Sequence, residues 1–193
     1  MGAEGESVEA VVRRGDREEP LAGSSRLPVV LVLDRLRSAH NVGNLLRVAE
    51  ATRAEGIVAC GYTACPPHPK LEKTARGCDR LVPCETAETA AEAVRRLKGR
   101  GYTVYAVETV EGASPYYAVR YAFPCALVLG NEALGVSEEA LALCDGYVSL
   151  PALGCKNSIN VGNAGAVVLF EALRQHGLGQ QGTTGGWPGV RRG

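Results

Sequence analysis

Short runs of apolar, often β-branched residues recur along the middle of the chain, and polar or helical stretches separate them. The runs cover residues 29–33, 57–60, 102–107, 125–129 and 147–150. A short, wholly apolar run is typical of a strand that is buried on both faces, as in a parallel sheet. We therefore predict a strand over each run.

The segments between these runs favour helices. Apolar residues of segment 44–55 recur at helical spacing, and Gly56 is expected to end that helix. Ser137 is a suitable N-cap for a short helix that ends at Leu143. We also predict helices over 86–98 and 160–175, and a loop rich in proline and basic residues over 66–80.

This alternation predicts an α/β fold in which helices cover both faces of a parallel sheet. Ligands of such sheets bind at the carboxyl ends of the strands. The polar, patternless residues 1–27 are expected to be a flexible extension, and the Gly-rich residues 177–193 a disordered tail. The folded domain is therefore predicted to cover residues 28–176.

Charge and cysteine content exclude several classes of protein. Lys and Arg total 21 and so do Asp and Glu, so nucleic-acid binding would need a local basic patch. The sequence shows neither a signal peptide nor an apolar segment long enough for a membrane span, and we expect a cytoplasmic protein. The seven cysteines include no Cys-x-x-Cys pair. They are expected to be small buried apolar residues without disulfides, and no metal site is expected.

Polar residues gather at three junctions between a strand and a helix. After the first strand come Asn41 and, six residues later, Arg47. The simple alternative is an N-cap followed by a surface arginine. Arg47 is flanked by apolar residues near a helix start that prefers anions, however, which favours an anionic partner such as a phosphate.

The second junction is Gly130-Asn131-Glu132, and the third ends in Ser158-Ile159-Asn160. A tight turn that exposes Glu132 would explain the second junction, but the third holds more polar residues than one helix cap needs. The glycine spacing of a P-loop or of a dinucleotide-binding turn is missing. The sequence also offers no Ser–His–Asp set, acidic pair or metal cluster for hydrolysis.

Taken together, these motifs resemble a known family. Asn41-x5-Arg47, Gly130-Asn131-Glu132-x2-Gly135-Val136 and Leu150-Pro151…Ser158-Ile159-Asn160-Val161 are similar to the three motifs of the SpoU (TrmH-like) branch of the SPOUT RNA methyltransferases. The resemblance covers residues 28–176. It implies a SPOUT α/β-knot with a C-terminal trefoil knot, an obligate homodimer, S-adenosyl-L-methionine as cofactor, a ribose 2′-hydroxyl as methyl acceptor, and no metal.

The resemblance also implies roles for individual residues. Arg47 would assist deprotonation of the 2′-hydroxyl, either through a perturbed guanidinium or through the RNA phosphate. Asn41 would orient the phosphate or Arg47, and Glu132 would hold neighbouring loops and Arg47. Ser158 and Asn160 would shape the pocket. The residues implied in cofactor binding are Val107, Gly130, Leu150, Ser158 and Ile159.

Two features depart from the family pattern. Many relatives carry a leucine where Ile159 stands, and a serine or alanine more often than Gly162. Many also carry a separate N-terminal RNA-binding domain, for which 27 residues are too few. We therefore expect RNA contacts from basic residues of the domain itself, although a solvated basic surface is the alternative: Arg35, Arg37, Lys70, Lys73 and Arg76, with Arg53 and Arg80 nearby.

The sequence thus predicts an S-adenosylmethionine-dependent 2′-O-ribose methyltransferase that acts on tRNA or rRNA. The rival hypothesis is a catalytically inactive RNA-binding scaffold that retains the knot. Intact Arg47, Glu132, Ser158 and Asn160 count against it. A methyltransferase of the ordinary Rossmann type is disfavoured because its Gly-rich first loop is missing.

Overall fold

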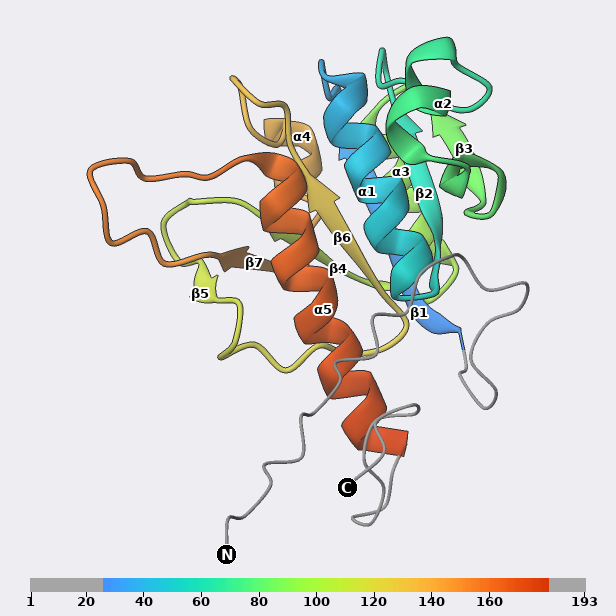
Figure 1. Ribbon diagram of the computed structural model, residues 1–193. Helices are drawn as coiled ribbons and strands as arrows, with labels where there is room; N and C mark the ends of the chain where they lie inside the picture. Colours follow the sequence, from blue (N-terminus) through green and yellow to red (C-terminus); the bar gives the residue numbers. More distant parts are fainter. Residues whose placement is uncertain (1–25, 181–193) are drawn as a thin grey trace, which may run out of the picture. The chain divides into compact units, whose positions relative to one another are not determined.

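The computed structural model describes residues 26–180 of the protein. It shows a parallel sheet of seven strands with helices on both faces (Figure 1). In chain order the elements are β1 (Leu27–Asp34), α1 (Ala39–Ala51), β2 (Ala54–Cys60), α2 (Pro69–Ala75), the 3-10 helix η1 (Cys78–Arg80), β3 (Cys84–Ala87), α3 (Ala90–Gly99), β4 (Thr103–Val107), β5 (Ser114–Pro115), β6 (Cys125–Leu129), α4 (Glu138–Leu141), β7 (Gly146–Ser149) and α5 (Val161–Gln180). The strand order across the sheet is β3-β2-β1-β6-β4-β7-β5. The predicted α/β fold class is confirmed at this level.

Alternate residues of the central strands build two separate cores. Leu31 and Leu33 of β1 pack on the face that α1 and α5 cover, together with Leu127 and Leu129 of β6. The intervening residues of the same strands pack with α3 and α4 on the opposite face. Both faces are apolar because both are covered, which explains why the strands read as unbroken apolar runs.

Helix α1 lies at the centre of its layer, between α2 and α5 (Figure 1). Gly43 allows the close approach of α2: a Cβ atom at this position would lie 2.1 Å from Thr74 Oγ1 and 3.0 Å from the backbone nitrogen of Ala75. The Thr74 hydroxyl also donates to the carbonyl oxygen of Ala39, at 3.4 Å. Helix α2 is therefore packed directly against the helix that contains Asn41 and Arg47.

The bounds of the first helix differ from the prediction. Helix α1 begins at Ala39 and ends at Ala51, whereas the sequence predicted 44–55. Ser38 is the N-cap, and its side chain accepts a hydrogen bond from the Asn41 backbone N–H. The helix ends before Arg53, which has a φ of +55°. Gly56, expected to stop the helix, instead lies within β2.

Other predicted boundaries also shift. The predicted loop 66–80 contains α2 and η1. The predicted helix 86–98 is confirmed as α3 but begins later, at Ala90, because residues 86–87 end β3. Helix α5 continues to Gln180, past the predicted end of the domain. The rest of the predicted extension and tail, residues 1–25 and 181–193, lies outside the described part of the chain. No helix within residues 26–180 is long and apolar enough to cross a membrane.

Candidate functional site

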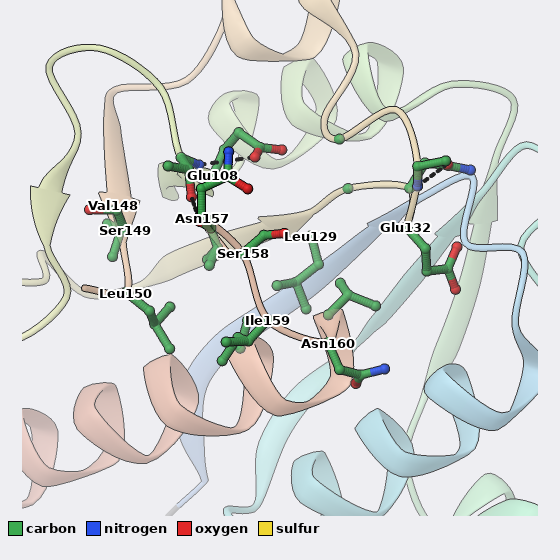
Figure 2. Close-up of a pocket in the computed structure, with 18 residues that line it drawn as sticks. Glu108, Leu129, Glu132, Val148, Ser149, Leu150, Asn157, Ser158, Ile159 and Asn160 are labelled. Carbon is green, nitrogen blue, oxygen red and sulfur yellow. Dashed lines mark hydrogen bonds between the residues drawn. The ribbon is translucent and has the colours of Figure 1, made fainter. Parts of the chain in front are cut away.

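A pocket of about 310 Å³ lies where the carboxyl ends of β4, β6 and β7 meet the start of α5 (Figure 2). Its walls come from three segments that are far apart in the sequence: residues 107–109, 129–135 and 148–164. Leu129, Leu150 and Ile159 provide apolar surface within it. The pocket therefore occupies the edge of the sheet at which ligands of parallel α/β folds bind.

A closed turn after β6 forms one wall. Asn131 and Gly135 exchange two backbone hydrogen bonds, of 3.0 and 2.9 Å. A Cβ atom on Gly130 would lie 2.2 Å from the backbone of Gly135 and Val136, so only glycine fits there. Gly135 has a φ of +69°, which glycine adopts without strain. These two glycines explain why the motif surrounds its polar residues with glycine.

The Glu132 carboxylate joins this turn to the start of α1. It accepts hydrogen bonds from the backbone N–H groups of Arg37 and Ser38, at 2.9 and 3.1 Å, and from the Asn41 side-chain amide at 2.8 Å. Partial burial raises the pKa of Glu132, but the N–H groups and the amide more than offset this, so the pKa lies below its ordinary value. Glu132 is therefore held as a carboxylate at neutral pH.

Asn41 links the second motif to the third. Its amide donates to Glu132, and its side-chain oxygen accepts a hydrogen bond from Asn160 Nδ2 at 3.1 Å. The Asn160 side-chain oxygen in turn accepts from the backbone N–H groups of Gly162 and Asn163, at 2.9 and 3.2 Å, and so caps α5. One line of hydrogen bonds thus connects all three motifs.

Glu108, directly after β4, supports the pocket from the other side. Its carboxylate accepts from the backbone N–H groups of Thr109 and Val136, at 2.9 and 3.0 Å. In Figure 2, Glu108 and Glu132 lie on either side of Leu129. They are the only charged residues among those that line the pocket, and both are acidic. This lining suits a ligand that carries positive charge or several hydrogen-bond donors.

The structure brings most of the predicted site residues together. The five residues predicted to bind the cofactor all line the pocket: Val107, Gly130, Leu150, Ser158 and Ile159. Glu132 and Asn160 line it as well. Asn41 lies behind this lining, 7% exposed. It is not the N-cap of α1, because Ser38 three residues earlier takes that position.

Arg47 does not join this group. It lies one turn beyond Gly43 on α1, is exposed, and is not among the residues that line the pocket. Within residues 26–180 no hydrogen bond or ion pair is found between Arg47 and Glu132, which binds the start of α1 instead. Arg47 therefore does not lie near the start of a helix, as the sequence indicated, because it belongs to the second half of α1.

The predicted RNA-binding residues occupy two places. Lys70 and Lys73 are exposed on α2, and Arg76, also exposed, is its C-cap. Arg37 is exposed before α1, whereas Arg35 pairs with the buried Asp34 at 3.0 Å and is only 36% exposed. Within residues 26–180 no ion pair is found for Lys70, Lys73 or Arg76, whereas Arg35 is partly neutralised by Asp34.

The sequence did not single out Glu108 or Ser38. Glu108 follows the predicted strand 102–107 directly, so its place at a strand end could have marked it. Ser38 precedes Asn41 by three residues, and both residue types cap helices well, so spacing alone could not decide between them.

The cysteines offer little chemistry at the site. Cys60 and Cys125 are buried, and burial raises the pKa of each thiol to about 12. Cys155 is exposed, and all seven are free thiols. In the described part of the chain, no three His, Cys, Asp or Glu side chains are grouped as a metal site would require.

Comparison with known proteins places this pocket in context. Residues 28–170 match the SpoU rRNA Methylase family. The tRNA (guanosine(18)-2′-O)-methyltransferase of Thermus thermophilus is 39% identical over 147 residues, which cover 76% of this chain and 75% of that protein. The 23S rRNA (guanosine-2′-O-)-methyltransferase RlmB of Ralstonia nicotianae is 35% identical over 162 residues, covering 83% of this chain and 64% of the relative.

A solved structure shows the same fold. The SpoU methyltransferase AviRb from Streptomyces viridochromogenes, in complex with AdoMet, matches with a TM-score of 0.71 at 26% identity. The match covers 80% of this chain and 62% of AviRb. The chain thus spans less than two thirds of the length of AviRb and of the Ralstonia relative.

The hydrogen bonds of Glu132 lead to a test by pH. Because its pKa is lowered in the folded protein, the carboxylate stabilises the fold at neutral pH and loses this effect as the pH falls through the folded-state pKa. We expect Glu132→Gln to lower the free energy of unfolding by about 1 kcal/mol at pH 7, a modest value since the group is exposed. Urea unfolding at pH 7 and at pH 3 should show a smaller difference at pH 3, which lies below the ordinary pKa of a glutamate.

The control for this experiment is Glu111→Gln, because Glu111 is an exposed acid with no hydrogen bond or ion pair found in the described chain. It should leave the free energy of unfolding unchanged at both pH values. A loss in Glu132→Gln that is the same at pH 7 and pH 3 would contradict the role of the charged form.

Proposed function

The chain belongs to the SpoU rRNA Methylase family, and from this we propose that it is an S-adenosylmethionine-dependent RNA 2′-O-ribose methyltransferase. Its relatives from Thermus and Ralstonia are named as enzymes that methylate a guanosine 2′-oxygen in tRNA and in 23S rRNA. We accordingly propose tRNA or rRNA as the substrate and the cytoplasm as the place of action. The observation that supports this most is the line of hydrogen bonds that joins the three motifs around one pocket.

The residues of the pocket fit the cofactor. Leu129, Leu150 and Ile159 offer apolar surface for an adenine ring. Glu108 offers carboxylate lone pairs to hydroxyl or ammonium donors. We propose that Val107, Gly130, Leu150, Ser158 and Ile159 hold the cofactor. Bound there, it would supply a methyl group already activated by its sulfonium.

The protein's own task is then to position the ribose and to remove its proton. We assign Ser158 and Asn160 to the wall that orients the 2′-hydroxyl, and Asn41 and Glu132 to holding that wall to α1. Arg47 is exposed, and a guanidinium is in general a poor base. We therefore propose that Arg47 binds the RNA phosphate and that this phosphate accepts the proton of the 2′-hydroxyl.

The basic residues of α2 extend the proposed RNA surface. Lys70, Lys73 and Arg76 belong to the helix that packs on α1 beside Gly43, one turn before Arg47. Arg35 and Arg37 lie at the carboxyl end of β1, next to Glu132. RNA that reaches Arg47 would therefore pass over α2, where it meets unneutralised charge.

We further propose a homodimer and a trefoil knot. Val167 and Phe170 of α5, 37% and 51% exposed, lie three residues apart on one side of the helix. Leu153 and Ile159 in the preceding loop are also exposed, at 99% and 51%. Exposed apolar side chains on one side of a helix are typical of an interface between subunits. Segment 150–160 returns the chain from β7 to α5, which packs on β1 and β6, and is the part that would thread the knot.

The catalytically inactive scaffold is disfavoured. A scaffold has no need for a pocket with two oriented carboxylates, yet Glu108 and Glu132 each accept hydrogen bonds from backbone N–H groups of neighbouring loops. The relatives are also named as methyltransferases, and the AviRb structure contains AdoMet.

The central test is Arg47→Ala. We expect methyl transfer to fall by about 10²-fold or more, because the phosphate loses its positioning charge. The dissociation constant for S-adenosylmethionine should stay within about twofold, since Arg47 does not line the pocket. Transfer of labelled methyl groups to unfractionated tRNA and rRNA measures the first quantity, and calorimetry the second.

Arg95→Ala is the matched control, because Arg95 is exposed on α3, on the opposite face of the sheet from α1 and Arg47. It should retain full activity. Near-normal methyl transfer by Arg47→Ala would remove Arg47 from the mechanism.

A second test concerns the RNA surface. Replacement of both Lys70 and Lys73 by Gln should weaken binding of fluorescein-labelled tRNA. It should also lower the slope of log K against log salt by about 2, because each lysine that neutralises a phosphate contributes about one to that slope. Affinity for S-adenosylmethionine should not change. An unaltered salt slope would show that α2 presents only a solvated surface.

A third test concerns the dimer. Phe170→Glu places a charge on the exposed face of α5 and should convert a dimer into a monomer in sedimentation velocity. Leu81→Glu is the control, since Leu81 is 66% exposed but lies beyond η1. A wild-type protein that sediments as a monomer, or a control that dissociates equally, would contradict an interface on α5.

A further inference from the structure

Tyr62 presents an exposed aromatic ring at the same edge of the sheet as the pocket. It follows β2 directly, and 61% of its surface is exposed. A large ring left in water at this edge calls for a physical reason, because aromatic side chains contribute strongly to cores and interfaces.

The tyrosine hydroxyl is anchored to a residue of the pocket wall. It lies 2.8 Å from the side-chain nitrogen of Asn131, from which it accepts a hydrogen bond. Asn131 is 4% exposed, and the same nitrogen donates to the carbonyl oxygen of Arg35 at 2.6 Å. Its side-chain oxygen accepts from the backbone N–H groups of Ala133 and Leu134. The ring is thus fixed at its polar end, while most of the residue stays exposed.

A basic side chain lies against Gly61, the residue before Tyr62. The aliphatic part of Arg35 passes over Gly61, where an added Cβ atom would lie 3.1 Å from Arg35 Cγ. Arg35 has a φ of +54°, a conformation that non-glycine residues rarely adopt and that the Asn131 bond holds in place. Arg37 is exposed two residues later, with its N–H bound to Glu132.

From this arrangement we infer that Tyr62 is a stacking platform for a nucleobase of the RNA, next to the nucleotide whose ribose enters the pocket. The inference rests on the proposed function. A ring fixed at one end loses little entropy when a base stacks on it, and every base has a π-face to offer. Arg37, exposed at the carboxyl end of β1, supplies charge for a flanking phosphate, whereas the Arg35 guanidinium is partly neutralised by Asp34. A protein partner would not require this charge beside a single ring.

The experiment compares two substitutions that both remove the hydroxyl. Tyr62→Phe keeps the ring, whereas Tyr62→Ala removes it, so their ratio isolates stacking from the anchor on Asn131. For fluorescein-labelled tRNA we expect Phe to stay within about threefold of wild type and Ala to bind about 10-fold more weakly. The salt slope of Tyr62→Ala should equal that of wild type, since the variant keeps every basic side chain that binds a phosphate.

Further variants separate stacking from apolar contact and from a loss of folding. Tyr62→Leu retains apolar volume without a π-face, and its RNA affinity should resemble that of Tyr62→Ala. It also takes the place of Tyr62→Ala if that variant does not fold. Tyr117→Ala removes a ring of the same type and similar exposure, 60%, beyond β5, and should leave RNA affinity unchanged. Affinity for S-adenosylmethionine, measured by calorimetry, should be equal in all four variants.

The possible outcomes are distinct. Equal RNA affinities for Tyr62→Phe and Tyr62→Ala would overturn the stacking role, as would a parallel loss of S-adenosylmethionine affinity in both, which would reveal a role through Asn131 alone. If wild-type protein bound the cofactor but no RNA, the proposed function itself would fail, and the inference with it.

Discussion

The site depends on the side-chain amide of Asn41. It is the one group that contacts both Glu132, in the turn after β6, and Asn160, at the start of α5. An amide can serve both because it has a donor and an acceptor at fixed geometry. An aspartate or a leucine at this position would satisfy one neighbour at most, and would leave a buried polar group without its partner. The segments it joins are 91 and 119 residues away along the chain.

Backbone packing makes this contact possible. Gly130 lets the turn after β6 close, and Gly43 lets α2 lie against α1. Neither glycine offers chemistry of its own. Each instead removes the one atom that would keep two segments apart, and so fixes where Glu132 and the basic face of α2 stand relative to α1. In this fold, the position of the polar site depends on the absence of a Cβ atom at Gly43 and Gly130.

Much of the fold could be predicted from the sequence, because unbroken apolar runs report burial on both faces and all the long strands of the sheet show them. The site was predictable as three loops at strand ends, since parallel strands place their carboxyl ends together. The start of α1 was not, because Ser38 and Asn41 are both good caps. The position of Arg47 outside the pocket, and the support from Glu108, depend on contacts between distant segments, which local spacing does not record.

The loop that contains Ser158 is exposed at every position from Pro151 to Asn160. Its end at Asn160 is held by hydrogen bonds to Asn41, Gly162 and Asn163. Before Asn160, the one hydrogen bond found in the described residues runs from the Thr109 hydroxyl to the Asn157 carbonyl oxygen, at 3.4 Å. A segment with so little burial opens at low free energy, and a ligand that needs it closed must supply that free energy. The binding free energy of any ligand of this pocket therefore equals the free energy of its contacts minus the free energy that is needed to order this loop. Substitutions at Gly154, where a Cβ atom meets nothing within 4 Å, would then tune affinity without touching the ligand, by stiffening the open state.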